Sequence, residues 1–164
     1  MDFVFFWGIG DTGKIQKGCL SQWWPCGFEV GGVEYNCAEQ YMMAMKAKTF
    51  ADAETFGKIM GTSKPKLIKS LGRQVKGFDE RTWNAVKYDV VVDGNTAKFS
   101  QNPELKSFLL STWPATLVEA SPVDRVWGVG LAENDPLITD ETKWRGLNLL
   151  GKALMAVRAR LKTA

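Results

Sequence analysis

The segment at residues 35–50, YNCAEQYMMAMKAKTF, constrains the fold more than any other part of the chain. Its alanine, methionine and tyrosine side chains leave no wide polar face, and a helix that is apolar on nearly every side is normally buried. The segment nevertheless contains Glu39 and Lys46, which are two helical turns apart. We expect both side chains on one face, about 10 Å apart along the axis. Because a buried charge is costly unless it is paired or used, these residues either have structural partners or form the floor of a site.

The start of this helix offers a structural explanation for Glu39. Asn36 is suited to be an N-cap residue, and Glu39, three positions later, would complete a capping box. A capping carboxylate needs no catalytic role to account for its presence. The sequence leaves both interpretations open.

Composition restricts the chemistry. The chain has 164 residues, a net charge of +3 and no histidine. The lack of histidine excludes Ser-His-Asp and Cys-His nucleophilic systems and every histidine-ligated metal site. Acid–base chemistry must then come from Asp, Glu, Lys, Tyr or Cys. Three cysteines without C-x-x-C spacing predict reduced thiols in a cytoplasmic protein, with no zinc site and no disulfide framework.

The remaining bulk properties are those of an ordinary globular chain. Residues 1–10 lack the basic region and the long apolar run of a signal peptide or a membrane span, so no membrane association is expected. Seven tryptophans and nine phenylalanines are many for this length, and such rings line pockets for bases and sugars as well as cores. The small positive charge is not a nucleic-acid footprint.

Hydrophobic patterning predicts one α+β domain over residues 1–164, with a small mixed β-sheet surrounded by several helices. Strands are expected at 3–7, 116–121 and 125–131, and a hairpin near 28–34 with a turn at Gly31-Gly32. Helices are expected at about 36–50, 52–60, 66–73, 79–97, 103–111 and 146–161. The long helix at 79–97 contains a β-branched run and a turn-like Asp93-Gly94-Asn95 sequence, where an early break is possible.

A glycine-rich segment follows the first strand. Residues 8–13 fit G-x-G-x-x-G, and residues 8–14 fit G-x-x-x-x-G-K, both of which are patterns of phosphate-binding loops. We reject both, because Ile15 replaces the Ser or Thr that would hold magnesium and no helical pattern follows. The segment is interpreted as a glycine-rich turn.

Two further regions contain candidate binding residues. In the expected strand at 125–131, Gly128 and Gly130 share one face and would leave a flat slot for a ligand or for another backbone. Asp124 stands just before this strand, at an edge where active-site carboxylates often lie. Trp23 is adjacent to Trp24; either one of the two is exposed or faces a pocket, or both pack into irregular core.

A basic stretch runs from Lys64 to Lys76. It contains four lysines and Arg73. Such stretches are usually solvated helix faces, and phosphate binding by Arg73 or a neighbouring lysine is the alternative.

Taken together, four segments resemble the NADAR or YbiA-like family: LSQWWP, GGVEYNCAEQYMMAMKA, TLVEASPVDRVWGVGL and WRGLNLLGKALMAVR. The resemblance runs in order from about Phe3 to Leu161. Two positions depart from the family pattern. Gln22 follows Ser21 where the family usually has Ser-Asn, and Gln40 follows the helix glutamate where the family often has His.

The resemblance implies an α+β enzyme that hydrolyses N-glycosidic bonds of ribosylated bases, without a metal, a cofactor or an obligate protein partner. Two substrate groups are associated with the family. One consists of phosphoribosylamino-pyrimidine intermediates of riboflavin synthesis, and the other is ADP-ribose attached to guanine bases, including those in DNA.

The expected chemistry matches the residues already singled out. Breaking a C1′–N bond builds positive charge on the ribose, which a carboxylate stabilises or relieves by moving a proton. Glu39 is the candidate, with a pKa raised by burial unless a nearby lysine offsets it. The resemblance supports Lys46 as an amine nucleophile that forms an imine at C1′, and a simpler role is as a cation near phosphate. Asp124 would hold a ribose hydroxyl or activate water.

The remaining expected contacts are to the substrate. Trp127 and Trp23 would stack on the base. The other residues assigned to substrate binding are Ser21, Gly128, Gly130 and Arg73. A non-catalytic module that binds ADP-ribose or a nucleotide is the alternative, because it would share the aromatic and glycine features. A dedicated nucleic-acid-binding protein is disfavoured because the basic residues are not concentrated enough.

Overall fold

The computed structural model describes residues 2–163 and divides them into two compact units. One unit contains the chain up to Ser21 and from Pro103 onward, and the other contains Gln22–Asn102. The described residues form six α-helices and two pairs of short strands, one parallel and one antiparallel, so the α+β class is confirmed.

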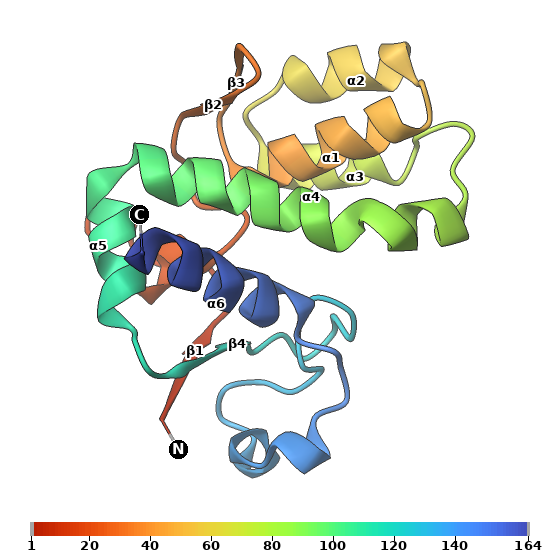
Figure 1. Ribbon diagram of the computed structural model, residues 1–164. Coiled ribbons are helices and arrows are strands. Elements are labelled where there is room, and N and C mark those ends of the chain that lie inside the picture. Colours follow the sequence, from red (N-terminus) through yellow and green to blue (C-terminus); the bar gives the residue numbers. More distant parts are fainter. Residues whose placement is uncertain (1, 164) are drawn as a thin grey trace. The chain divides into compact units, whose positions relative to one another are not determined.

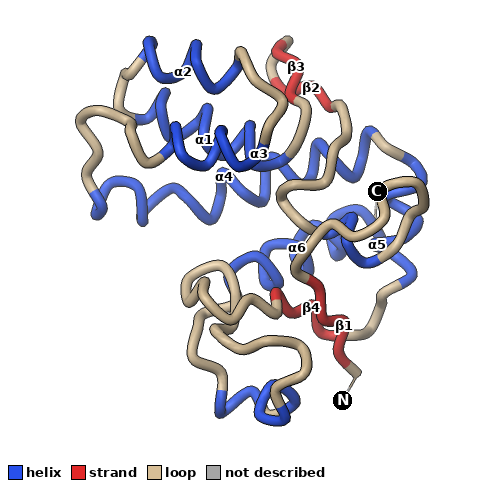
Figure 2. Tube along the Cα trace, turned by 180° about the vertical axis from the view of Figure 1, so that it is seen from behind, coloured by secondary structure: helices blue, strands red, loops and turns tan. Residues whose placement is uncertain are grey.

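The unit at Gln22–Asn102 consists of a hairpin and four helices (Figures 1 and 2). Strands β2 (Phe28–Val30) and β3 (Val33–Tyr35) pair antiparallel around Gly31-Gly32, as expected. The helices are α1 (Ala38–Thr49), α2 (Ala53–Met60), α3 (Pro65–Gly72) and α4 (Glu80–Gln101). Helix α1 contacts the other three helices, and eight of its twelve residues are buried. The expectation that the apolar segment forms a buried helix is confirmed.

Helix α4 does not break at its turn-like sequence. It continues through Asp93-Gly94-Asn95 to Gln101. A Cβ atom at Gly94 would lie 2.5 Å from the ring of Tyr41 on α1, so the glycine is present for close helix packing and not for a turn. The Asn95 side chain donates to the carbonyl oxygen of Val91 at 2.9 Å and stays within the helical pattern. Packing against α1 therefore overrides the local preference of this sequence.

The other unit is built around a parallel strand pair. Strands β1 (Phe3–Phe6) and β4 (Thr116–Glu119) pair with Phe3 opposite Thr116 and Phe6 opposite Glu119. Helix α6 (Leu149–Lys162) packs against β4 and against α5 (Pro103–Ser111). Its leucine and valine stripe is buried as expected, except that Leu147 precedes the helix and is exposed. Three short 3₁₀ helices complete the unit: η1 (Lys17–Leu20), η2 (Pro136–Thr139) and η3 (Glu141–Lys143).

The expected strand at 125–131 is wrong. This segment is irregular, and its carbonyl oxygens accept hydrogen bonds from residues 145–150, for example from Asn148 N to Gly128 O at 3.1 Å. A Cβ atom at Gly128 would lie 2.9 Å from the carbonyl oxygen of Asp124 and 3.0 Å from that of Glu119. At Gly130 the backbone has a φ of +71°, which a strand does not allow. The glycines thus permit another backbone to approach, which was one of the two expectations for them.

Within residues 2–163, no helix has the length and apolar character needed to cross a membrane.

Candidate functional site

The first turn of α1 differs from the expected capping arrangement. The N-cap position is Cys37 and not Asn36, so Glu39 is the second residue of the helix. Gln40 occupies the third position, and its Oε1 accepts a hydrogen bond from the backbone N–H of Asn36 at 2.9 Å. The expected capping box with Glu39 is therefore wrong, because the neighbouring amide side chain takes that position. Capping does not account for the Glu39 carboxylate.

Glu39 is held at the start of a buried helix. Its side chain is 7% exposed, and its backbone N–H donates to the carbonyl oxygen of Gln22 at 2.9 Å. Acidic side chains in the first helical turn are stabilised by the positive end of the helix dipole. Desolvation acts in the opposite direction, since it disfavours the charged form.

Lys46 lies in the electrostatic field of two other candidate residues. Burial is the largest influence and lowers its pKa below the usual value. The Glu39 carboxylate raises the Lys46 pKa, and the Arg73 guanidinium lowers it. Three residues proposed from the sequence are therefore close enough to influence one another. A lysine with a lowered pKa has a larger neutral fraction, which an amine nucleophile requires.

An exposed aromatic ring covers the Lys46 ammonium. Its Nζ lies 4.6 Å from the centroid of the Phe78 ring, a cation–π arrangement. Phe78 in turn packs edge-on against Phe50 at the end of α1, with centroids 5.5 Å apart. No sequence pattern selects Phe78, because it lies in the connection between α3 and α4.

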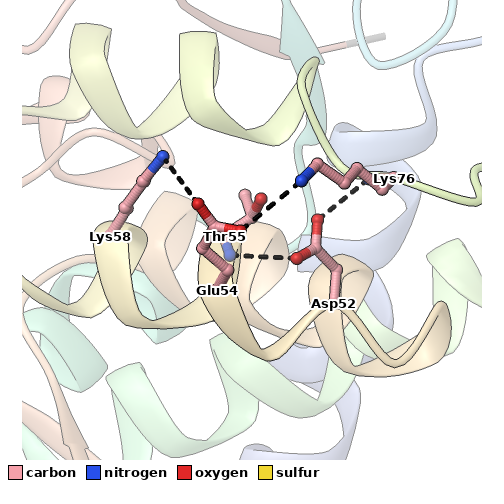
Figure 3. A network of polar contacts seen from close by, with 5 residues as sticks. All are labelled: Asp52, Glu54, Thr55, Lys58 and Lys76. Carbon is pink, nitrogen blue, oxygen red and sulfur yellow. Dashed lines mark hydrogen bonds and ion pairs between the residues drawn. The ribbon is translucent and has the colours of Figure 1, made fainter.

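Asp52 fixes the position of this connection (Figure 3). One carboxylate oxygen accepts from the N–H of Thr55 at 3.0 Å and caps α2, as expected from the sequence. The other accepts from the N–H of Lys76 at 2.9 Å, two residues before Phe78. The bond from Lys76 and then the bonds from Thr55 hold the pKa of Asp52 at about 2. Glu54 adds exposed ion pairs with Lys58 and Lys76, each at 3.4 Å.

A pair of amide side chains in the same unit as Glu39 was not identified from the sequence. Asn95 Nδ2 donates to Gln22 Oε1 at 2.8 Å, which fixes the orientation of the Gln22 amide. Among the described contacts, Gln22 Nε2 has only the weak acceptor Sδ of Met42, at 3.9 Å. The Oδ1 atom of Asn95 is buried and has no hydrogen-bond partner. The departure from the family's Ser-Asn pattern at Gln22 was the available signal, whereas Asn95 resembled a turn residue.

In the other unit, Asp124 organises a turn. Its Oδ1 accepts from the N–H of Val126 at 2.9 Å and from the N–H of Trp127 at 2.8 Å. Its own N–H donates to Ser121 Oγ at 3.0 Å. These contacts fix the half-buried Trp127 relative to Asp124, and they use only one of the two carboxylate oxygens. Ser21 belongs to the same unit, directly after η1, and is buried.

Asn148 supports this segment, because its N–H donates to the carbonyl oxygen of Gly128 at 3.1 Å, and the sequence did not predict this role. Its backbone is left-handed, with a φ of +52°, and its side chain is 1% exposed. The amide bridges β4, because Oδ1 accepts from Glu119 N and Nδ2 donates to Leu117 O, both at 3.0 Å. A left-handed asparagine before a helix leaves no distinctive sequence pattern.

Trp23 lies in the unit with Glu39, next in the chain to Gln22, and it is half-buried, whereas Trp24 is buried. This difference in burial agrees with the alternative in which one of the two rings is not packed into the core. Among residues 2–163, no group of three or more Cys, Asp or Glu side chains is arranged to hold a metal ion. The chemistry available is that of carboxylates, a lysine amine, an arginine and amides.

The chain belongs to the NADAR domain family, whose model matches residues 5–162. A protein of Acanthamoeba polyphaga mimivirus named N-glycosidase R617 is 48% identical over 163 residues, covering 95% of this chain and 94% of the relative. N-glycosidase YbiA of Escherichia coli is 33% identical over 138 residues, covering 84% and 76%. A chloroplastic protein of Arabidopsis thaliana named riboflavin biosynthesis protein PYRR is 34% identical over 125 residues, which cover 76% of this chain and 17% of that protein.

The fold is similar to a solved structure. The NMR structure of the E. coli protein YbiA superposes with a TM-score of 0.79 and 29% sequence identity, covering 99% of this chain and 86% of that one. Family membership and this similarity bear out the resemblance identified from the sequence.

Proposed function

We propose that the protein is an N-glycosidase that hydrolyses the C1′–N bond of a ribosylated base, and that residues 1–164 act as one NADAR domain. The observation that carries the proposal is the shared electrostatic environment of Glu39, Lys46 and Arg73 on and beside a buried helix. The names of the mimivirus and bacterial relatives support the class of reaction. As substrates we propose ADP-ribose on guanine in nucleic acid or a phosphoribosylamino-pyrimidine; the name of the Arabidopsis relative supports the second group.

In the proposed reaction, the neutral amine of Lys46 attacks C1′ of the ribose. The C1′–N bond breaks, its electron pair stays with the base, and Glu39 in its acid form donates a proton to that base. The ring oxygen then leaves C1′ and takes up one proton from Lys46 Nζ, so that the sugar opens to a protonated imine with a free hydroxyl group. Water then hydrolyses the imine, with the Glu39 carboxylate as base, and releases the sugar and the free lysine. The lowered pKa of Lys46 supports this role.

The other residues are proposed to bind the substrate. Arg73 is exposed and pairs with a phosphate of the substrate. The second carboxylate oxygen of Asp124 holds a ribose hydroxyl or activates water, while the first maintains the turn. Trp23 and Trp127 stack on the base, and Ser21 lies on the binding surface. Gly128 and Gly130 shape the segment that contains Trp127.

A parallel hydrolysis assay tests the proposal. One reaction contains the phosphoribosylamino-pyrimidine and the other contains ADP-ribosylated guanine DNA, each with wild type, Glu39→Gln and the exposed control Glu104→Gln. We expect wild type and the control to cleave at least one substrate and Glu39→Gln to bind it without cleavage. Folded protein that cleaves neither substrate refutes the proposal, and retained binding would then favour a non-catalytic ADP-ribose or nucleotide module.

Borohydride trapping tests Lys46 separately. Reduction of the imine during turnover should leave a sugar covalently attached to the protein, and mass spectrometry should locate it on Lys46. Lys48→Arg, a change two residues along α1, should still give the adduct, whereas Lys46→Arg should not. An active enzyme without an adduct would leave Lys46 as an electrostatic residue only.

A further inference from the structure

A pocket of about 310 Å³ lies in the unit that contains β1 and β4, at the carboxyl ends of these two parallel strands. Trp7 and Ala120, which follow directly after the two strands, both line it. The ladder continues one step beyond the strands, since Ala120 N–H donates to Phe6 O at 2.8 Å. The carboxyl ends of parallel strands are a common location for ligands in α/β sheets, and the volume is at the lower end of the range for small-molecule sites.

The lining combines one large ring with small residues. Trp7 is 51% exposed. Four of the other seven lining residues are glycine or alanine: Gly8, Gly10, Ala120 and Ala132. No atom lies within 4 Å of the place where a Cβ atom of Gly8 would stand. A half-exposed indole beside residues with small or no side chains is suited to the face of a planar ring.

The loop that forms one side of the pocket is held in place before any ligand binds. Gln16 Oε1 accepts from Gly18 N at 2.6 Å. Its Nε2 donates to the carbonyl oxygens of Ile9 at 2.7 Å and Asp11 at 3.1 Å. One side chain thus joins the glycine-rich turn to the start of η1. A preformed wall reduces the entropy lost on binding.

Two opposite charges lie among the lining residues. Lys17 Nζ donates to Glu133 Oε1 at 2.6 Å, and the two side chains are 46% and 55% exposed. This single bond leaves further donors on the ammonium and further acceptor positions on the carboxylate. A ligand with both an acceptor and a donor on one edge can therefore hydrogen-bond to both groups without carrying a charge.

We propose that this pocket binds an amino-substituted purine ring such as adenine, with its face on Trp7 and its polar edge at Lys17 and Glu133. The exocyclic amine donates to Glu133, and a ring nitrogen accepts from Lys17. None of the residues proposed for catalysis lines the pocket.

Titration of the full chain with AMP, followed by amide NMR and by calorimetry, tests this assignment. We expect saturable binding with chemical-shift changes centred on residues 7–10, 16–17, 120 and 132–133. Trp7→Ala should weaken AMP binding about tenfold, as expected for the loss of one base–aromatic stack. Trp7→Phe and Leu137→Ala, an exposed apolar control in the same unit, should bind nearly as wild type.

Ribose 5-phosphate, which lacks the ring, separates ring binding from phosphate binding. Equal affinity for AMP and ribose 5-phosphate would overturn the assignment, and so would shift changes centred elsewhere or no saturation at millimolar AMP. The shift map on wild type remains decisive if Trp7→Ala fails to fold. None of these readouts requires turnover, so a failure of the pocket and a failure of the proposed reaction are distinguishable.

Discussion

The backbone N–H of Glu39 donates a 2.9 Å hydrogen bond to the carbonyl oxygen of Gln22. The side chain of Gln22 is fixed in turn by Asn95, which reaches it from α4. The carboxylate proposed for catalysis is therefore placed by its own helix and by the segment that contains Trp23. The amide donors of Gln22 are little used, and we propose that a substrate oxygen or base carbonyl accepts from them.

Replacing Gln22 tests this role. Gln22→Met keeps the length of the side chain and removes its amide, so kcat/KM should fall about tenfold, the value for losing one neutral hydrogen bond of ~1 kcal/mol plus a small positioning effect. Asn95→Leu should reduce kcat/KM in the same direction, because it releases the Gln22 amide. Gln74→Met, on an exposed residue of the same unit, is the matched control. An unchanged kcat/KM for Gln22→Met would exclude a role for its amide in binding or catalysis.

Removing Arg73 should move the pH dependence of the reaction. The Arg73 guanidinium lowers the Lys46 pKa, so Arg73→Met should raise that pKa. Activity that depends on the neutral amine increases as pH rises through the Lys46 pKa. This rising limb of the pH–rate profile should shift to higher pH in the variant. Lys69→Met, on the exposed face of α3, should leave the limb in place. A limb that stays or moves to lower pH in Arg73→Met would contradict the electrostatic relation between these residues.

Two substitutions separate the structural and chemical roles of Asp124. Asp124→Asn keeps an Oδ1 acceptor for the N–H groups of Val126 and Trp127 but removes the negative charge. Asp124→Ala removes both. We expect Asp124→Asn to keep a melting temperature close to wild type and lose most of kcat, whereas Asp124→Ala loses stability as well. Full activity in Asp124→Asn would assign this residue to the turn alone.

The hydrogen bonds that the Asp52 carboxylate accepts predict an acid-sensitive contribution to stability. Its pKa is about 2 in the folded protein against an ordinary value of 3.8, so the folded state favours the carboxylate. This contribution is fully present above about pH 4 and is lost as pH falls toward about 2. The free energy of unfolding, measured with urea at about pH 5 and about pH 3, should therefore decrease less on acidification for Asp52→Asn than for wild type. The control Asp89→Asn, at an exposed position on α4, should show the same decrease in unfolding free energy as wild type. An equal decrease in Asp52→Asn would show that the Asp52 carboxylate does not stabilise the fold.

Local sequence patterns were sufficient for several elements. Helix α5 begins at Pro103 and ends at Ser111 as expected, and Asp52 caps α2. These features depend on neighbours in the chain, such as a proline in the first helical turn or a carboxylate before it. The two-turn spacing of Glu39 and Lys46 likewise required only helical geometry. The sequence alone therefore determined the helix that contains both residues, and the resemblance to the NADAR family determined the class of reaction.

Other features depended on contacts that the chain makes over long separations. Residues 125–131 have a strand-like pattern, but the backbone of 145–150 approaches so closely that they form an irregular segment. The long helix continues through Gly94 because Tyr41, far away in the sequence, packs against it. For the same reason Phe78 and Asn148 gave no sequence signal, since each acts through a residue on another element. Tertiary structure alone decided these positions, because burial and hydrogen bonding between distant segments outweigh local preference.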